Sequence, residues 1–312
     1  ATLHPSGAYA YKEPCEEFHN RVFRLASKYY KTMIIIYHEA DLDGICSGAI
    51  LLKRFPFARL IGHDYGRTLP PIPDGQDIIM ADVSLPMAQM GELARRSNSF
   101  TFIDHHETAI KEFRAMGLGS DIRGVFDVNF AACELVWDDC YPGVPAPRAV
   151  KLLGMYDTWR GQKTEQWDTE ILPFQYGMRW VQSPDDFPKE VLYSNLADYC
   201  DEYIRDGKTI LKYQKIQDKK SCKFAFETVA FGHNTIAMNS TTFNSQLFES
   251  VYDPSRHDLM MVFCFNQGRW KFSIYSTRSD IHCGELAKLY GGGGHKGAAG
   301  FAVDRIEEVC AL

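Results

Sequence analysis

Histidine and aspartate residues gather at the ends of three short apolar segments of the chain. They are His38, Asp41 and Asp43 after the first segment, Asp82 after the second, and Asp104, His105 and His106 at the end of the third. Imidazole and carboxylate groups bind divalent metal ions, and two such ions about 3.5 to 4 Å apart can hold a hydroxide and aim it at phosphorus. These residue types and their spacing predict metal-assisted hydrolysis of a phosphoester.

Each of these residues alone also has a structural explanation. Asp41 or Asp43 could cap the helix that follows them. Asp82 could be a turn residue, and His105 could be an ordinary hydrogen-bonded side chain. Their joint placement favours metal ligands, because the carboxyl ends of parallel strands meet at one edge of a sheet.

A crevice that contains Asp41, Asp43 and Asp82, together with Asp157 further along the chain, gathers four negative charges. Their repulsion raises carboxylate pKa values and weakens the fold unless cations are present, and four carboxylates balance two divalent ions. The mixed ligand set favours Mn²⁺, with Mg²⁺ as the alternative. The chain contains no Walker-type phosphate loop, no G-x-S-x-G and no H-E-x-x-H, so other hydrolase classes have no motif support.

The elements that must position these residues are typical of an α/β fold with a parallel sheet. The predicted strands of the first two thirds are 33–37, 59–62, 77–81, 100–103 and 123–126. The predicted helices are 44–55, 86–96, 108–116, 131–140 and 147–156, preceded by a leading helix over 15–30.

A second domain is expected after a polar helical stretch. The runs 222–231, 235–238, 259–265 and 269–275 alternate like strands, and 283–290 predicts a helix. We therefore expect a metal-binding domain over 1–182, a helical linker over 183–220, and a smaller α/β domain over 221–312 across a cleft.

Four glycines, 291–294, follow the last predicted helix. A helix C-cap explains one glycine but not four. Successive backbone N–H groups can form a nest for phosphate oxygens. Arg278 could bind the same phosphate bidentately, and His295 could form a hydrogen bond to it.

Composition limits the class of protein. With 312 residues, 45% hydrophobic and 24% charged, the chain fits two ordinary globular domains, and its net charge of −6 argues against a long basic track for nucleic acid. The apolar runs are too short to span a membrane and no signal peptide is recognisable, so we expect a cytoplasmic protein. Nine cysteines without a C-x-x-C pair indicate reduced thiols.

The ordered motifs resemble those of the DHH phosphoesterase superfamily, which includes RecJ-like exonucleases, nanoRNases and cyclic-dinucleotide phosphodiesterases. The resemblance rests on His38-x-x-Asp41-x-Asp43, Asp82 and Asp104-His105-His106, followed by the Gly291–Phe301 segment, which is similar to the signature of the DHH-associated C-terminal domain. It covers nearly the whole chain and implies a two-domain enzyme.

The resemblance also implies a role for each matching residue. It places one metal at His38 and Asp41, a second at Asp43, His105 and Asp157, and Asp82 between them. Glu39 is an alternative to His38, which stands one residue closer to Asp41 than in many short members, and Asp138 and Asp139 are alternatives to Asp157. Asp104 would orient a histidine, His106 would contact the phosphate or leaving group, and Arg278, Gly293, Gly294 and His295 would bind substrate.

Within this superfamily, the chain length and acidic charge favour very short substrates. We expect hydrolysis of short oligoribonucleotides, including linear dinucleotides such as pGpG, to mononucleotides. The alternatives are a 3′-phosphoadenosine 5′-phosphate phosphatase, a cyclic-dinucleotide phosphodiesterase, or, in another class, a catalytically silent nucleotide-binding protein. The resemblance also leaves a homodimer open.

Overall fold

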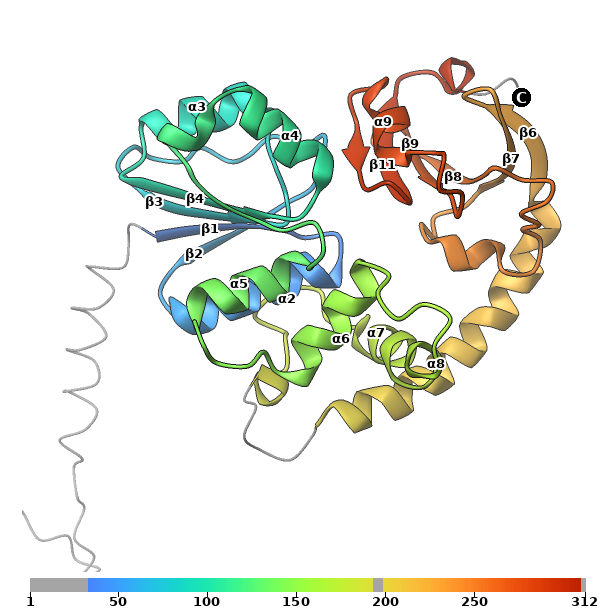
Figure 1. Ribbon diagram of the computed structural model, residues 1–312, viewed down its shortest axis with the longest axis horizontal. Helices are drawn as coiled ribbons and strands as arrows, with labels where there is room; N and C mark the ends of the chain where they lie inside the picture. Colours follow the sequence, from blue (N-terminus) through green and yellow to red (C-terminus); the bar gives the residue numbers. More distant parts are fainter. Residues whose placement is uncertain (1–32, 193–198, 310–312) are drawn as a thin grey trace, which may run out of the picture.

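The computed structural model describes residues 33–192 and 199–309, and it contains two sheets joined by a long helix (Figure 1). The leading helix expected over 15–30 lies outside the described residues. The α/β class is confirmed: the first sheet is wholly parallel and the second is mixed. In the part of the chain that the structure describes, no helix is long and apolar enough to cross a membrane.

The first sheet has the order β2-β1-β3-β4-β5, with every neighbouring pair parallel. Its strands are β1 (Met33–His38), β2 (Arg59–His63), β3 (Asp77–Ala81), β4 (Ser99–Asp104) and β5 (Arg123–Phe126). All five match predicted strands to within one residue at either end. The carboxyl ends of β1, β3 and β4, which carry the predicted ligands, are therefore neighbours.

Helices cover both faces of this sheet (Figure 1). They are α2 (Leu42–Arg54), α3 (Met87–Arg95), α4 (Glu107–Ala115), α5 (Ala132–Cys140) and α6 (Arg148–Asp157). Side chains of β1 alternate between the two cores: Ile34 and Ile36 pack with α3 and α4, whereas Ile35 and Tyr37 pack with α2, α5 and α6. Burial on both faces explains why this strand is apolar throughout.

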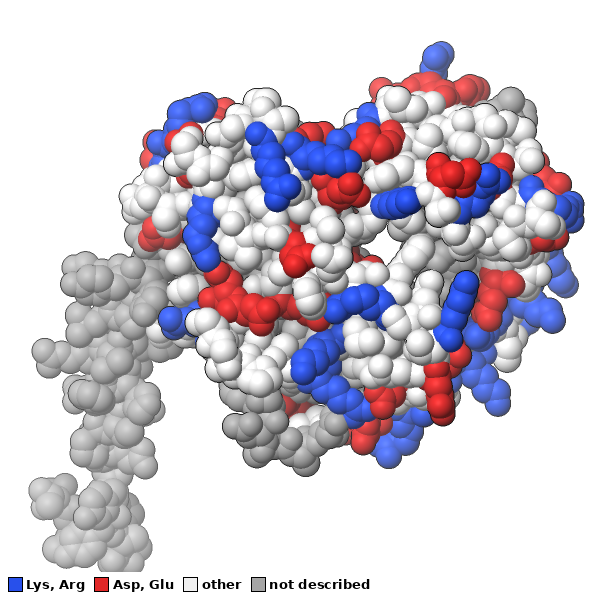
Figure 2. Space-filling model, viewed as in Figure 1, with Lys and Arg blue, Asp and Glu red and all other residues white. Residues whose placement is uncertain are grey.

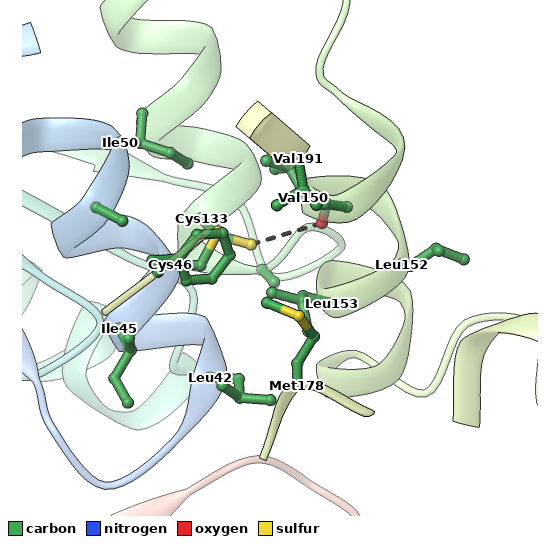
Figure 3. Packing of buried hydrophobic residues seen from close by; sticks show 14 of the residues in the cluster. Leu42, Ile45, Cys46, Ile50, Cys133, Val150, Leu152, Leu153, Met178 and Val191 are labelled. Carbon is green, nitrogen blue, oxygen red and sulfur yellow. Dashed lines mark hydrogen bonds between the residues drawn. The ribbon is translucent and has the colours of Figure 1, made fainter. Parts of the chain in front are cut away.

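Figure 3 shows part of the hydrophobic core to which α2, α5 and α6 contribute. It places Cys46 of α2 beside Cys133 of α5, and both side chains are fully buried. The Cys133 thiol lies 3.7 Å from the Val150 carbonyl oxygen of α6. Cys46 and Cys133 are both free thiols.

The second sheet has the order β10-β11-β9-β8-β7-β6, in which only the β7–β8 pair is parallel. Its elements are β6 (Phe226–Ala230), β7 (His233–Asn239), β8 (Leu259–Asn266), β9 (Arg269–Tyr275), β10 (Gly293–Gly294), β11 (Ala298–Val303) and helix α9 (Cys283–Lys288). The strands β10 and β11 were not predicted, because glycine and alanine carry little strand signal.

Helix α8 (Cys200–Ser221) joins the two sheets and occupies the later part of the range expected for the linker. Before it lie a π-helix (Trp167–Ile171) and α7 (Leu172–Met178), which were not predicted. Short 3₁₀ helices occur at Leu118–Ser120, Lys189–Leu192, Cys222–Phe224, Ser245–Phe248 and Ile306–Glu308. Helices α7 and α8 pack closely because Gly177 and Gly207 lie at their crossing, where an added Cβ would meet backbone carbonyl oxygens of the other helix.

The two halves of the molecule also make direct contacts, and an opening between them is visible in Figure 2. Gly294 of β10 donates its N–H to Thr108 Oγ1 of α4 at 3.2 Å, and Tyr176 of α7 donates to Gln246 at 2.9 Å. The ring of Trp159 packs against the cores of both halves and lies against Gly297. These contacts place the second domain directly beyond the carboxyl ends of the first sheet.

The crossing of α7 and α8 makes a stability prediction. In Gly207→Ala the new Cβ would lie 1.7 Å from the Pro173 carbonyl oxygen, so the helices must separate. We expect the free energy of unfolding to fall by about 3 kcal/mol or more in a denaturant titration. Gly119→Ala is the matched control, since that site has open space and an ordinary backbone, and it should lose no stability. Equal stability of the two variants would contradict the packing described.

Candidate metal centre

The predicted ligands converge at the carboxyl edge of the first sheet. His38 ends β1, Asp82 follows β3 and His105 follows β4, while Asp43 lies in the first turn of α2 and Asp157 ends α6. The His38, Asp43, Asp82 and His105 side chains are almost fully buried. Four groups of three such side chains among the described residues bring their ligand atoms within 4.8 Å of one another, and two of these groups consist only of predicted metal ligands.

The first group contains His38, Asp41 and Asp82. His38 Nδ1 lies 2.7 Å from Asp41 Oδ2 and 3.5 Å from Asp82 Oδ2. Asp41 also caps α2, because its Oδ1 accepts the Gly44 N–H at 2.9 Å. The capping and ligand explanations of Asp41 are therefore compatible, since each uses a different carboxylate oxygen.

The second group contains Asp43, His105 and Asp157. His105 Nε2 lies 3.4 Å from Asp43 Oδ2 and 3.3 Å from Asp157 Oδ2. The same nitrogen lies 3.3 Å from Asp82 Oδ1. Asp82 thus presents one oxygen to each group, which is the arrangement that a ligand shared by two ions requires.

The backbone around these ligands is unusually constrained. Asp82 has φ +62°, a left-handed backbone conformation that is energetically unfavourable for a residue with a Cβ. Its N–H donates to the Ile103 carbonyl oxygen at 3.0 Å. Gly44 lets α2 begin directly against His38, whose carbonyl oxygen would be 2.2 Å from an added Cβ. Both features hold carboxylates at a fixed place beside the strand ends.

Backbone N–H groups at the start of a helix hold Asp43 in place. Its two oxygens accept the backbone N–H groups of Ala132 at 2.9 Å and Cys133 at 2.7 Å, at the N-terminus of α5. Because the helix dipole places positive partial charge there, this contact partly compensates the buried carboxylate. One edge of Asp43 remains directed at His105.

The titration behaviour of the site shows how much negative charge it carries. Burial, followed by the charges of Asp82 and Asp157, raises the pKa of Asp43 well above its usual value. Burial, opposed by His105 and assisted by Asp41, raises the pKa of Asp157 to about 6. These carboxylates are costly to ionise without added positive charge.

The two histidines titrate in the opposite sense. Burial alone would lower the pKa of His38 and His105, but hydrogen bonds and charges of the surrounding aspartates outweigh it and raise both values well above the usual range. Hydrogen bonds from these histidines overcome burial at Asp82 and hold its pKa well below its usual range. In the metal-free protein, the surrounding aspartates therefore favour the protonated form of both imidazole rings.

The donor set fits divalent metal ions. Both oxygens of Asp82 and Oδ2 of Asp157 are buried without a hydrogen bond of ordinary geometry, as is Nδ1 of His38. Buried polar atoms of this kind usually have a partner, and ions bound at the two ligand groups would be partners for these atoms. The mixture of imidazole and carboxylate donors suits Mn²⁺ and accommodates Mg²⁺.

Asp104 and His106 lie beside the two groups. Asp104 Oδ1 contacts His106 Nδ1 at 2.7 Å and accepts the backbone N–H groups of His105 at 2.8 Å and His106 at 3.1 Å. It therefore fixes both the backbone and the ring of the following histidines.

The alternative ligands lie elsewhere. Glu39 forms an ion pair with Arg67, and Asp139 forms one with Arg123 of β5. Asp138 is exposed on α5. None of these acids belongs to the ligand groups found among the described residues, and the geometry favours His38 over Glu39 and Asp157 over the acids of α5.

The predicted phosphate nest needs correction. The N–H groups of Gly291 and Gly292 donate to the carbonyl oxygens of Lys288 and Ala287 at 3.0 Å each, and that of Gly294 donates to Thr108. An added Cβ at Gly293 would lie 2.9 Å from Thr108 Oγ1. Gly293 is therefore needed for close packing against α4, and Gly292 and Gly294 for close packing against β11. The N–H groups of Gly291, Gly292 and Gly294 already have acceptors.

Arg278 also lies in a different setting from the one predicted. It forms ion pairs with Asp258 and with Asp280, so its guanidinium already has two carboxylate partners. His295, by contrast, does reach the metal centre. Its ring stacks on His106 and lies beside His105, with centroid distances of 4.6 Å in both cases.

Three residues of the site were missed from the sequence. Asp64 Oδ1 lies 3.6 Å from His38 Nε2, Lys271 contacts Asp64, and the exposed ring of Tyr65 lies edge-on to His38 at 5.7 Å. Asp64 follows β2 and could have been found by the strand-end argument that identified the other acids. Lys271 lies on a strand of the second domain, where no sequence signal marks it.

Comparison with known proteins gives distant similarities. No family model matches the chain. The uncharacterized protein R106 of Acanthamoeba polyphaga mimivirus is 24% identical over 241 residues, which cover 74% of this chain and 54% of that protein. The chain thus spans about half the length of this curated relative.

Among solved structures, the pGpG-specific phosphodiesterase PggH from Vibrio cholerae is 14% identical, with a TM-score of 0.46 over 88% of this chain and 94% of that one. An exopolyphosphatase-related protein from Bacteroides fragilis is 14% identical, with a TM-score of 0.42 over 94% and 93%. Exonuclease RecJ bound to manganese is 14% identical, with a TM-score of 0.40 over 90% of each chain.

The similarity of this chain to these three proteins is in structure and extends over most of its length. The chain itself has ordered histidine and aspartate motifs at the strand ends of a parallel-sheet domain, followed by a second domain with a mixed sheet.

The electrostatics of Asp157 make a prediction that separates metal binding from folding. Asp157→Asn removes a carboxylate that is costly to ionise, so the metal-free variant should unfold at the same or a higher temperature than the wild type. Its affinity for Mn²⁺ should fall at least about tenfold in a calorimetric titration, because a ligand is lost. Asp138→Asn, on the exposed face of α5, is the control and should change neither quantity. Unchanged Mn²⁺ affinity in Asp157→Asn would remove this residue from the centre.

Proposed function

We propose that this protein is a divalent-metal-dependent phosphodiesterase that hydrolyses very short oligoribonucleotides, such as the linear dinucleotide pGpG, to mononucleotides. The observation that carries the proposal is the position of Asp82, whose two oxygens face two separate ligand groups. When bound there, two Mn²⁺ ions, or Mg²⁺ in their place, would activate water and neutralise charge on the phosphate. The residues that would hold them are His38 and Asp41 on one side, Asp43, His105 and Asp157 on the other, and Asp82 between.

His106 would contact the substrate directly. Its Nδ1 is occupied by Asp104, which leaves Nε2 for a phosphate or leaving-group oxygen. Burial lowers the pKa of His106, but the charge and hydrogen bond of Asp104 outweigh it and raise the value. A protonated ring can donate a hydrogen bond from Nε2 and supply a proton to the departing oxygen.

The second domain supports a preference for short substrates. His295 stands over the histidines of the first domain, and its loop is fixed because the Gly284 N–H donates to the His295 carbonyl oxygen at 2.9 Å. A substrate bound at the metals would therefore meet the second domain within a short distance. The exposed ring of Tyr65 beside His38 offers a surface on which a base could stack.

The surface charge is consistent with this preference. On the face drawn in Figure 2, Lys and Arg side chains are interspersed with Asp and Glu. A long strand would favour a continuous basic path, since its affinity comes largely from phosphate contacts. Mixed charge of this kind favours a substrate held mainly by the metals and by a few nearby side chains.

The test is a product time course with Mn²⁺ on 5′-labelled RNA of two, three, five and ten nucleotides. We expect the rate to be highest between two and five nucleotides and His105→Ala to be inactive at every length, because it removes a ligand of the proposed centre. 3′-Phosphoadenosine 5′-phosphate and cyclic dinucleotides are assayed alongside. Faster turnover of either would favour those alternatives, and faster degradation of the longest RNA would contradict the short-substrate proposal. Absence of Mn²⁺-dependent turnover on all of these substrates would favour a silent nucleotide-binding protein.

A further inference from the structure

A line of charged side chains connects the second sheet to the metal centre. Lys271 Nζ, on β9, lies 3.2 Å from Asp64 Oδ2, in the loop after β2. Asp64 Oδ1 lies 3.6 Å from His38 Nε2, within ion-pair distance. The opposite nitrogen, His38 Nδ1, faces Asp41 and Asp82. His38 therefore has one ring nitrogen directed at the ligand group and the other directed at Asp64.

This geometry is typical of a histidine that binds a metal. A carboxylate on the second ring nitrogen fixes the tautomer and the ring orientation, and its loss typically lowers metal affinity about 10- to 100-fold. Asp64 is itself held locally, because its Oδ1 accepts the Tyr65 N–H at 2.8 Å. In this chain the carboxylate has an additional partner, Lys271, which belongs to the other domain.

The Lys271–Asp64 ion pair is partly shielded from solvent. The side chains are 33% and 20% exposed, respectively, whereas many ion pairs of this chain are more exposed. Partly buried charges are screened by salt less than exposed ones, so their attraction is better retained at ordinary ionic strength. Separation of the domains would leave Asp64 without this cation.

We propose that Lys271 and Asp64 are positioning residues for His38, and that docking of the second domain through this pair strengthens metal binding at His38, Asp41 and Asp82. By thermodynamic linkage, metal binding at this group would in turn favour the docked arrangement. The inference rests on the proposed metal centre and adds a link between that centre and the domain interface.

The chain contains a matched control pair. Lys288 of α9 lies 3.6 Å from Glu112 of α4, so this ion pair also crosses between the two domains. Neither residue belongs to the ligand groups. Lys288→Met therefore reports on a general weakening of the interface, whereas Lys271→Met reports on the connection to His38.

The experiment is calorimetric titration of the full chain with Mn²⁺ as the probe, for the wild type and for Lys271→Met, Asp64→Asn, the double variant, Lys271→Arg and Lys288→Met. Asp64→Asn should weaken one of the two binding steps about 10- to 100-fold. Lys271→Met should weaken the same step about fivefold or more, which is the range of a typical coupling between sites. The double variant should bind as Asp64→Asn does, Lys271→Arg should recover most of the affinity, and Lys288→Met should resemble the wild type.

Several outcomes would overturn the inference. Wild-type affinity in Lys271→Met would do so, as would equal losses in Lys271→Met and Lys288→Met or additive losses in the double variant. Thermal unfolding of each metal-free variant checks that the chain is folded. If Asp64→Asn does not fold, the Mn²⁺ affinities of Lys271→Met and Lys288→Met test the inference. A wild-type chain that binds no Mn²⁺ would contradict the proposed function as well, whereas normal two-step binding that Lys271→Met leaves unchanged would contradict this inference alone.

Discussion

The repulsion among four aspartates at one sheet edge is the constraint on which the rest of the structure depends. Asp43 and Asp82 are almost fully buried there, so water screens their charges little, whereas the side chains of Asp157 and Asp41 are 26% and 40% exposed. The metal-free chain compensates with two protonated histidines and with the N-terminus of α5. Divalent ions would replace the protons on those histidines. The folded arrangement is thus built around positive charge that the protein itself supplies only in part.

The scaffold keeps these groups in place at some cost. Asp82 adopts a left-handed backbone conformation, and Gly44 brings α2 directly against His38. On the opposite side, the glycine run lets β10 approach Thr108, so that His295 stacks on His106. Strain and close approach of this kind are common where a site must have one geometry, because the surrounding packing can maintain them.

Much of the first domain could be predicted from the sequence. The strands of a parallel sheet are buried on both faces, so their apolar runs are recognisable, and the acids at their carboxyl ends must converge. This is why the positions of His38, Asp82 and His105 relative to one another follow from the chain alone. Asp64 obeys the same rule at the end of β2, so its place at this edge of the sheet also follows from the sequence.

The second domain was less predictable for physical reasons. β10 and β11 are rich in glycine and alanine, whose small side chains carry little strand preference. The glycine run was interpreted as a phosphate nest, but the N–H groups of Gly291 and Gly292 donate to carbonyl oxygens of α9, and that of Gly294 donates to Thr108 of α4, some 180 residues earlier in the chain. The partners of Arg278 and the contact of Lys271 with Asp64 are likewise tertiary, so no local pattern reveals them.

The measurement that tests the central claim most directly is anomalous X-ray diffraction at the manganese edge from crystals of this protein grown with Mn²⁺. The account predicts two anomalous peaks, one beside His38 and Asp41 and the other beside Asp43, His105 and Asp157, with an oxygen of Asp82 bound to each. A single peak, or two peaks away from Asp82, would contradict it.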